Sequence, residues 1–186
     1  MLATLPLALL LAAADPIPSP ATTPVPAVAT AFDPLWDQLA GEWTGEGTGE
    51  PGVGLGTATF LFELDRNVIV RRSRSDYPAS ANRPATHHQD LMVISPSGRP
   101  TEARAVYFDN EGHVLQYAAA WSPDGKTLAF LSPTGGPRFR LAYRFENADS
   151  VLVSFEVAPP GSGEFKTYVS GVMRRVTRGK LATKVP

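Results

Sequence analysis

The chain has 186 residues, a formal net charge of −1 and no cysteine. This length accommodates one ordinary domain, and a near-neutral charge balance offers no basic surface for nucleic acid. The absence of cysteine excludes disulfides, thiolate metal sites, cysteine nucleophiles and a lipid-anchored N-terminal cysteine.

The first fourteen residues form an apolar run that ends in small side chains. Such a run is typical of a signal peptide, and Ala12 and Ala14 provide an A-x-A cleavage site before Asp15. The run lacks a preceding Lys or Arg, but the prolines that follow at once oppose a buried strand or helix. It is also too short to span a membrane, which takes roughly twenty apolar residues. We therefore expect an exported protein, periplasmic or secreted, that is not a lipoprotein.

Residues 15–31 form a Pro/Ala/Thr-rich tract without a periodic apolar face, which predicts a disordered tether. Residues 32–40 predict one short helix, because Asp33 can cap its start and Pro34 suits its first turn. Residues 177–186 are expected to form a C-terminal tail after the folded domain, which we place at 32–176.

After the helix, strand-like runs alternate with turn residues at near-regular spacing. The clearest run has Phe139, Leu141, Tyr143 and Phe145 alternating with arginines. Counting residues 41–49 as the first strand gives about ten strands, and the short loops between them force antiparallel pairing. Closure removes the two bare edges of such a sheet, so the sequence predicts an all-β, up-and-down antiparallel barrel, with a two-sheet sandwich as the alternative. Ten strands enclose more space than side chains fill, which predicts a cavity.

The segment LAGEWTGEGTGE, residues 39–50, resembles the G-x-W start of lipocalins and other calycins. In those families the Trp plugs one end of the barrel beneath an Arg of the last strand, which implies that role for Trp43 with Arg174 or Arg175. The chain more closely resembles uncharacterised bacterial calycins of the DUF1579 type, relatives of nitrobindin, in GEWTGEGTG, HHQDLMVIS, VYFDNEGHVLQY and SPDGKTLAFLS. This likeness extends over about 41–176. Nitrobindins hold haem through a His near the C-terminal end, but the final run here, FKTYVSGVMRRV, contains none, so we expect no cofactor.

The three histidines are His87, His88 and His113. His88 and Asp90 share one face of a strand because they are two residues apart. With His113 they are weak candidates for a zinc site, and as a pair they are weak candidates for proton transfer in a small isomerase or hydrolase. The simpler interpretation is that the histidines are solvated at a strand mouth. We therefore predict no metal and favour a protein that is not an enzyme.

Three arginines, Arg71, Arg72 and Arg74, lie in one strand-like run. Alternation places Arg72 and Arg74 on one face and Arg71 on the other. An inward arginine beside a tyrosine would favour a carboxylate-bearing ligand, whereas a frayed strand end would leave all three solvated.

The leading hypothesis is a barrel that binds a small, mostly apolar ligand, with or without a carboxylate, in its cavity. The residues predicted to contact it are Phe60, Phe62, Arg72, Arg74, Tyr107, Tyr117, Trp121, Phe139 and Tyr143. The alternatives are a small enzyme that uses His88 and Asp90, a haem-binding nitrobindin-like protein, and a structural domain with a filled interior that binds another envelope protein.

Overall fold

The computed structural model describes residues 32–176 as one closed antiparallel barrel. The expected signal peptide, tether and tail lie outside the described residues. One 3₁₀ helix, η1 (Pro34–Gln38), precedes ten strands. The strands are β1 (Gly41–Gly49), β2 (Gly54–Glu63), β3 (Val68–Tyr77), β4 (Thr86–Ser97), β5 (Arg99–Asp109), β6 (Val114–Trp121), β7 (Thr127–Leu131), β8 (Arg138–Asn147), β9 (Ser150–Ala158) and β10 (Lys166–Arg175).

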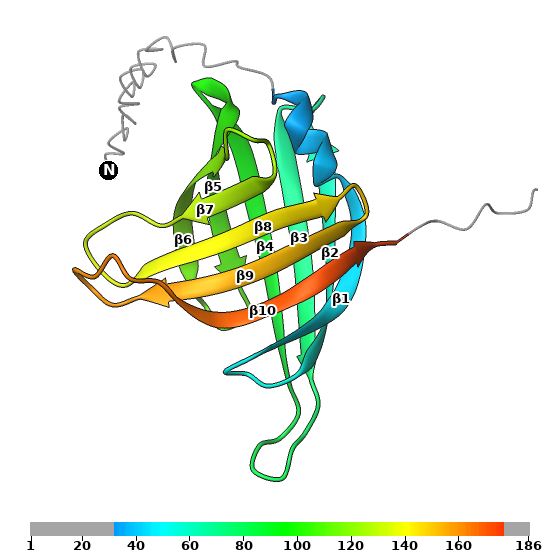
Figure 1. Cartoon of the computed structure of the whole chain (residues 1–186), viewed down its shortest axis with the longest axis vertical. Coiled ribbons are helices and arrows are strands. Elements are labelled where there is room, and N and C mark those ends of the chain that lie inside the picture. Colours follow the sequence, from blue (N-terminus) through cyan, green and yellow to red (C-terminus); the bar gives the residue numbers. More distant parts are fainter. Residues whose placement is uncertain (1–31, 177–186) are drawn as a thin grey trace, which may run out of the picture.

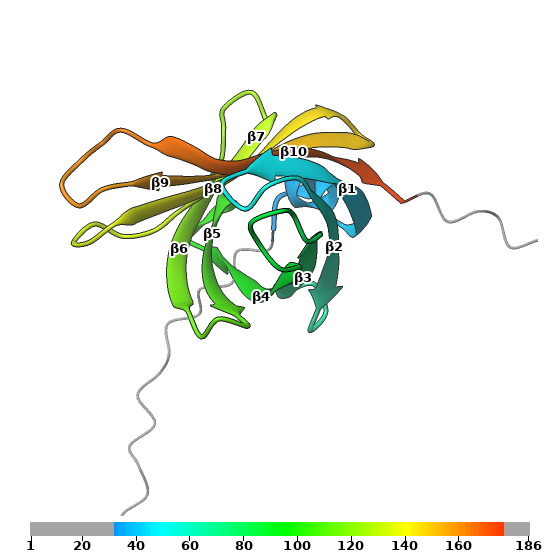
Figure 2. The same ribbon diagram turned by 90° about the horizontal axis from the view of Figure 1, so that it is seen from below.

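Each strand pairs with the next along the chain, and β1 pairs with β10 to complete the ring. The predicted up-and-down barrel is therefore confirmed, and the sandwich alternative is wrong. Figure 1 shows β8, β9 and β10 running across the direction of β2 to β5, and Figure 2 shows the same ring of strands from below. Within residues 32–176, no helix has the length and apolarity that crossing a membrane requires.

Strands β1 and β10 approach each other so closely that glycine is required between them. A Cβ atom added at Gly45 would lie 2.0 Å from the carbonyl oxygen of Val172. One added at Gly171 would lie 2.3 Å from the carbonyl oxygen of Glu46. The glycine-rich segment GEGTG thus allows the first and last strands to close the barrel, since any larger side chain would push them apart.

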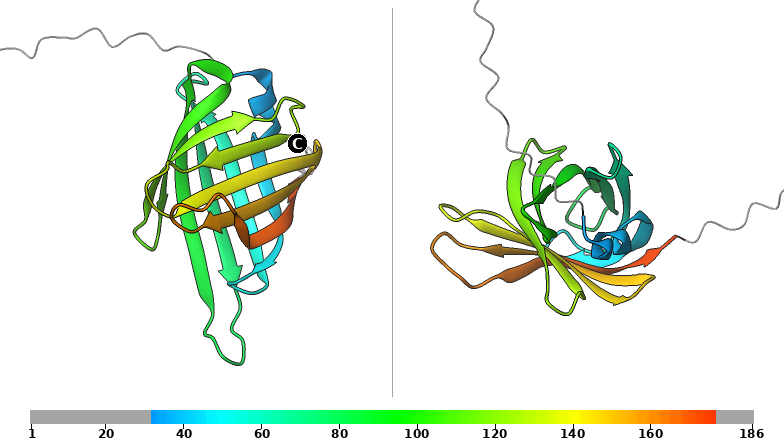
Figure 3. Two further views of the ribbon diagram at one scale, coloured as in Figure 1. Left: turned by 60° about the vertical axis from the view of Figure 1, so that its left-hand side comes forward. Right: turned by 90° about the horizontal axis from the view of Figure 1, so that it is seen from above.

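The predicted helix over 32–40 is shorter and more tightly wound than expected. Asp33 caps it by accepting a hydrogen bond from the Leu35 backbone N–H at 2.9 Å, and Pro34 begins it. The helix ends before Gly41, whose φ of +118° turns the chain into β1. Five residues are enough to bring Trp36 into the end of the barrel, where its indole N–H donates to the Pro100 carbonyl at 3.0 Å. Figure 3 shows η1 lying over this end of the barrel when seen from above.

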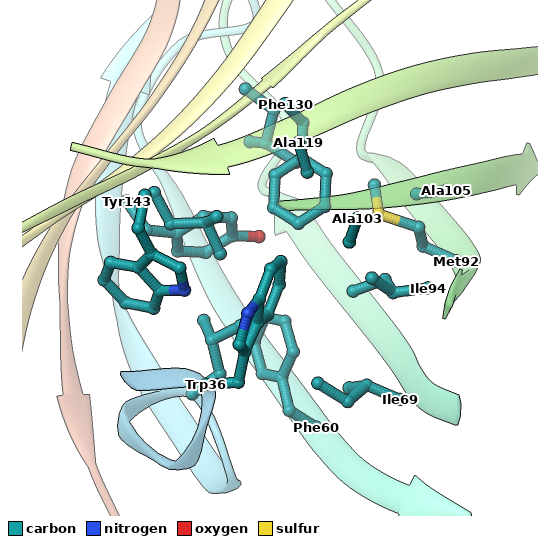
Figure 4. Packing of buried hydrophobic residues seen from close by; sticks show 14 of the residues in the cluster. Trp36, Phe60, Ile69, Met92, Ile94, Ala103, Ala105, Ala119, Phe130 and Tyr143 are labelled. Atoms are coloured by element: carbon teal, nitrogen blue, oxygen red, sulfur yellow. The ribbon is translucent and has the colours of Figure 1, made fainter. Parts of the chain in front are cut away.

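The half of the barrel next to η1 is filled by apolar side chains. Aromatic rings meet edge to face in the pairs Trp36–Trp121 and Phe60–Tyr143, with centroids 6.0 and 5.6 Å apart. Figure 4 shows how closely these side chains fill the space between the strands. Four residues predicted to contact a ligand belong to this packed half: Phe60, Phe62, Trp121 and Tyr143.

Trp43 is the plug that the calycin resemblance implied, and it is only 2% exposed. Its indole N–H donates to the Leu39 carbonyl at 2.9 Å. Arg175 is its direct neighbour across the β1–β10 pair, and the guanidinium carbon lies 4.2 Å from the ring centroid. Arg174 is the neighbour of Thr44 and points outward, so Arg175 alone covers Trp43.

Candidate functional site: a cavity with one polar wall

A cavity of about 650 Å³ occupies the half of the barrel opposite η1. Part of its wall is apolar and is formed mainly by β8, β9 and β10. The apolar side chains are Leu115, Phe139, Leu141, Val153, Phe155, Val157, Val169 and Met173. The facing wall is polar and is formed by β3, β4 and β5, with Tyr117 from β6. Its side chains are Arg71, Ser73, Ser75, His88, Asp90, Tyr107, Asp109 and Tyr117.

A buried ion pair between Arg71 and Asp90 lies at the base of the polar wall. The side chains are only 8% and 5% exposed, and Nη1 of Arg71 donates to Oδ1 of Asp90. Burial acts to lower the pKa of Arg71, but the Asp90 carboxylate and three tyrosines outweigh it, so the pKa is raised. Burial raises the pKa of Asp90 against the opposing pull of Arg71. The guanidinium therefore stays charged, and Asp90 neutralises it inside the barrel.

His88 occupies the middle of a hydrogen-bonded chain that runs from the cavity to the mouth. Its Nε2 lies 2.8 Å from the Tyr107 hydroxyl, and its Nδ1 lies 3.0 Å from Oε1 of Glu111. A neutral His88 donates from Nδ1 to Glu111 and accepts at Nε2 from Tyr107. A protonated His88 donates from both nitrogens, and the Tyr107 hydroxyl then donates to Oδ2 of Asp109, 3.3 Å away. Both ring nitrogens of His88 thus keep a hydrogen-bond partner in either arrangement.

Asp109 anchors the outer end of the same wall and is saturated with hydrogen-bond donors. Its Oδ1 accepts from the backbone N–H groups of Glu111 and His113, at 3.0 and 2.9 Å, and its Oδ2 lies 2.9 Å from Nδ1 of His113. Burial acts to raise the pKa of Asp109, but these hydrogen bonds outweigh it and lower the pKa. The hydrogen bond to Asp109 also raises the pKa of His113.

Three tyrosines converge on Arg71 from β5, β6 and β8. Burial raises the pKa of Tyr107, Tyr117 and Tyr143, and that of Tyr143 reaches about 12. The nearby Asp90 carboxylate adds to the rise in each case, and Arg71 opposes it. All three phenols therefore keep their protons at neutral pH.

The structure corrects the predicted role of the arginines. Arg72 and Arg74 point outward, away from the cavity, and Arg74 pairs with Asp76 on the outer surface at 2.5 Å. Arg71 is the inward residue because it shares a face with Ile69 and Ser73. The expectation that Arg72 and Arg74 bind a ligand is therefore wrong.

Other predicted site residues are placed as follows. Tyr107, Tyr117 and Phe139 line the cavity, as do His88 and Asp90, and Nε2 of His88 lies 3.9 Å from Oδ2 of Asp90. His113 is 61% exposed at the mouth and is engaged with Asp109 rather than with His88. Among the described residues, no three His, Asp or Glu side chains are placed to hold a metal ion.

Sequence reasoning missed several residues of the site. Asp109 and Glu111 are not among the predicted site residues, although Asp109 has the same strand parity as Tyr107. The apolar wall on β9 was also overlooked, although Val153, Phe155 and Val157 alternate along one strand. Parity within the strands would have found all of them except Glu111, which lies beyond the end of β5.

No protein-family model matches the sequence, and no curated protein matches it. Two solved structures are similar to the barrel. Rv2717c from M. tuberculosis matches with a TM-score of 0.58 and 16% identity, over 78% of this chain and 99% of that chain. The S-type phycobiliprotein lyase CPES from Guillardia theta matches with a TM-score of 0.52 and 7% identity, over 78% of this chain and 92% of that chain. These similarities support a calycin-like fold, whereas membership of the DUF1579 type stays a prediction.

Proposed function

We propose that the protein binds a small, mostly apolar ligand in the cavity of its barrel. The observation that carries the proposal is the cavity of about 650 Å³, which has one apolar and one polar wall. Its volume falls within the range of about 300–1,000 Å³ that is usual for small-molecule pockets, and a few polar groups on an apolar surface are typical of them. The similar barrel of a phycobiliprotein lyase supports the same view. A cavity of this size counts against a structural domain with a filled interior.

The carboxylate suggested for the ligand loses its support. That suggestion depended on an inward arginine beside a tyrosine, and Arg71 takes this position, whereas Arg72 and Arg74 lie on the outer surface. Arg71 does line the cavity, but Asp90 already neutralises it. The proposal therefore keeps an apolar ligand body and abandons the anionic group.

The test is binding by a protein whose cavity has been filled. Gly56 lines the cavity, and a Cβ atom added there meets nothing closer than Ser75 Oγ at 3.7 Å. In Gly56→Leu the new side chain should occupy the cavity without displacing the backbone. Thr57→Leu places the same leucine side chain on the outer face of the same strand and is the matched control.

Two measurements decide the question. Native mass spectrometry of the protein purified from its own host should show a bound small molecule with the parent and with Thr57→Leu, and none with Gly56→Leu. In a titration with the neutral fluorophore N-phenyl-1-naphthylamine, the parent and Thr57→Leu should bind the fluorophore, and Gly56→Leu should not. Equal fluorophore binding by Gly56→Leu and the parent would place the apolar site elsewhere and defeat the proposal.

Proton transfer to or from the bound ligand is a second candidate function. The observation in its favour is the chain from Tyr107 through His88 to Glu111, which connects the cavity with the mouth. After the ligand has been identified, it would be incubated with the protein in D₂O. Deuterium on a ligand carbon with the parent, but not with His88→Asn, would establish the activity, whereas no exchange with the parent would exclude an isomerase.

We also propose that the protein acts outside the cytoplasm. The support is the apolar run that ends at Ala12 and Ala14. Export should remove the first fourteen residues and leave Asp15 as the new N-terminus. Intact-mass measurement of the protein recovered outside the cytoplasm tests this, and a mature protein that retains Met1 would contradict it.

A further inference from the structure

The floor of the cavity contains hydrogen-bond donors that have no acceptor. Arg71 lines the cavity, and among the described residues its buried Nε has no hydrogen-bond partner. On β8, Phe139 and Leu141 line the cavity, and Tyr143 lies one inward position deeper, directly below the floor. Within residues 32–176, the buried hydroxyl of Tyr143 likewise meets no partner in full hydrogen-bond geometry. Figure 4 shows this hydroxyl oxygen pointing into the barrel.

The two groups cannot satisfy each other. Arg71 interacts electrostatically with Tyr143 and also lowers the pKa of its phenol through a side-chain hydrogen bond, but a guanidinium only donates hydrogen bonds. The phenol oxygen can accept from Arg71, and the phenol proton then still lacks an acceptor. Leaving a buried donor unpaired is costly, and groups left in this state in a folded protein require an explanation.

The acceptors nearby are already engaged. Oδ1 of Asp90 accepts from Arg71, and Asp90 is also hydrogen-bonded by Ser73. Asp109 has two donors on one oxygen and a histidine and a tyrosine near the other. Within the described part of the chain, the Arg71 Nε and the Tyr143 hydroxyl thus remain donors without a matched acceptor.

We infer that the polar end of the ligand is a neutral carbonyl group, which accepts hydrogen bonds from Arg71 at the cavity floor and from the Tyr143 hydroxyl directly beneath it. This inference rests on the proposed function and names the class of ligand that the site recognises. A carbonyl oxygen has two lone pairs and no proton, so it can accept from both donors at once.

The charge of the polar wall favours a carbonyl over a carboxylate. The Arg71–Asp90 pair is neutral as a unit, and Asp109 and Glu111 add two carboxylates on the same side of the cavity. An anionic ligand would lose its hydration and would meet these like charges in an apolar enclosure. A neutral acceptor gains the same hydrogen bonds without that repulsion.

The experiment compares three probes of equal length in displacing N-phenyl-1-naphthylamine: methyl nonyl ketone, undecane and decanoate. The ketone should bind about 3- to 10-fold more tightly than undecane, as expected for a net gain of about one neutral hydrogen bond. It should bind more tightly than decanoate as well. In Tyr143→Phe the ketone should lose most of that advantage, while undecane should bind as before.

Two further readouts separate recognition from a structural role. The carbonyl stretching band of the bound ketone should move to lower wavenumber in the parent, and part of the shift should disappear in Tyr143→Phe. Without ligand, Tyr143→Phe should be at least as stable as the parent, because it removes a buried hydroxyl that has no acceptor. Thr44→Val, which removes a hydroxyl from the outer face of β1, is the control and should change neither the band nor the affinity.

Each other outcome counts against the inference. Equal binding of ketone and undecane would overturn it and leave the proposed function standing. Tightest binding of decanoate would show that the site selects an anion. An unchanged ketone affinity and carbonyl band in Tyr143→Phe would remove Tyr143 from the site. If none of the probes displaces the fluorophore, the proposed function and the inference fall together.

Discussion

At the η1 end of the barrel, Trp36, Trp43 and Trp121 bury their rings and pack edge to face or tilted against neighbouring aromatic rings. At the opposite end, Tyr107 and Tyr117 also meet edge to face, with centroids 6.3 Å apart, but they border a cavity and an ion pair. The same ten strands build both ends. The difference therefore comes from the inward residues that each strand carries along its length.

The change from one kind of interior to the other occurs within single strands. On β3 the inward series runs from Ile69 to Arg71 and Ser73, and on β4 it runs from Met92 to Asp90. The apolar ends of these strands supply the hydrophobic burial that stabilises the fold. Their polar ends bury charge and unpaired donors, which cost stability and suit a binding site. The barrel thus separates a stabilising end from a functional end.

The sharpest test of the stabilising end is the truncation of Trp43. Trp43→Ala should lower the free energy of unfolding by about 3–5 kcal/mol, because it empties a buried site and removes the stacking partner of Arg175. Chemical denaturation measures the effect. Leu55→Ala, at the exposed mouth, is the control and should stay within about 0.5 kcal/mol of the parent. A Trp43→Ala protein as stable as its parent would show that the η1 end does not hold the barrel together.

The ion pair at the functional end gives the next largest effect. Asp90→Leu should lower the free energy of unfolding by about 3 kcal/mol, because it leaves the buried charge of Arg71 without a partner. The double change Arg71→Met with Asp90→Leu should recover most of that loss, since an apolar pair of similar volume replaces the ions.

Denaturation of the single and double variants would decide whether the pair serves binding or stability. Arg74→Met, on the outer face of the same strand, is the control and should unfold like the parent. If the double variant is less stable than Asp90→Leu, the pair is part of what holds the fold, and the separation of the two ends fails.

The architecture followed from the sequence because its signals are local. Alternation along each run, turn residues at short intervals and the glycines of 45–49 together require ten paired strands and a closed edge. Trp43 and its arginine neighbour followed from resemblance, and the register selects Arg175 over Arg174. The tight 3₁₀ turn of η1 was not predicted, because its length depends on the barrel end that it must fit.

The site was less predictable because it depends on parity and on contacts between distant strands. The three arginines 71, 72 and 74 gave no sign of which one points inward, since the run around them does not alternate cleanly. The pairing of Arg71 with Asp90 follows only once β3 and β4 are in register. How far the packed core extends is also a property of the assembled barrel. Phe60 and Tyr143 were therefore expected to line a cavity whose floor lies above them.

A smaller effect is expected from the titration of His113 at the mouth. Its hydrogen bond to Asp109 raises its pKa above the ordinary value of about 6.5, and the same contact helps to lower the pKa of Asp109. A raised histidine pKa stabilises the fold fully below its ordinary value, and this stabilisation is lost as the pH rises through the raised one. A lowered aspartate pKa stabilises above its ordinary value of about 4, and this is lost as the pH falls through the lowered one. The pair therefore contributes most at mildly acidic pH, between about 4 and 6.5.

Proton NMR of the His113 ring measures this directly. The titration midpoint should lie above about 6.5 in the parent and should fall in Asp109→Asn. Glu102→Gln, on the end of β5 next to η1, is the control and should leave the midpoint unchanged. A midpoint that does not respond to Asp109→Asn would mean that the polar mouth is not organised around Asp109.

The smallest expected effect concerns haem, which should not bind stably at the functional end. A histidine that ligates haem iron must point inward and have a free ring nitrogen, and β10 contains no histidine. His88 is the histidine whose hydrogen bonds reach into the cavity, but Tyr107 engages its Nε2 and Glu111 engages its Nδ1. His113 lies at the rim, where Asp109 holds its Nδ1. Ferric haem added to the purified protein should therefore give no sharp shift of the Soret band.

A tight one-to-one complex that disappears in His88→Ala or His113→Ala would overturn this prediction. It would also show that iron ligation can break the hydrogen-bonded chain, so that the polar wall would be a ligand set for a metal rather than a surface for a carbonyl group.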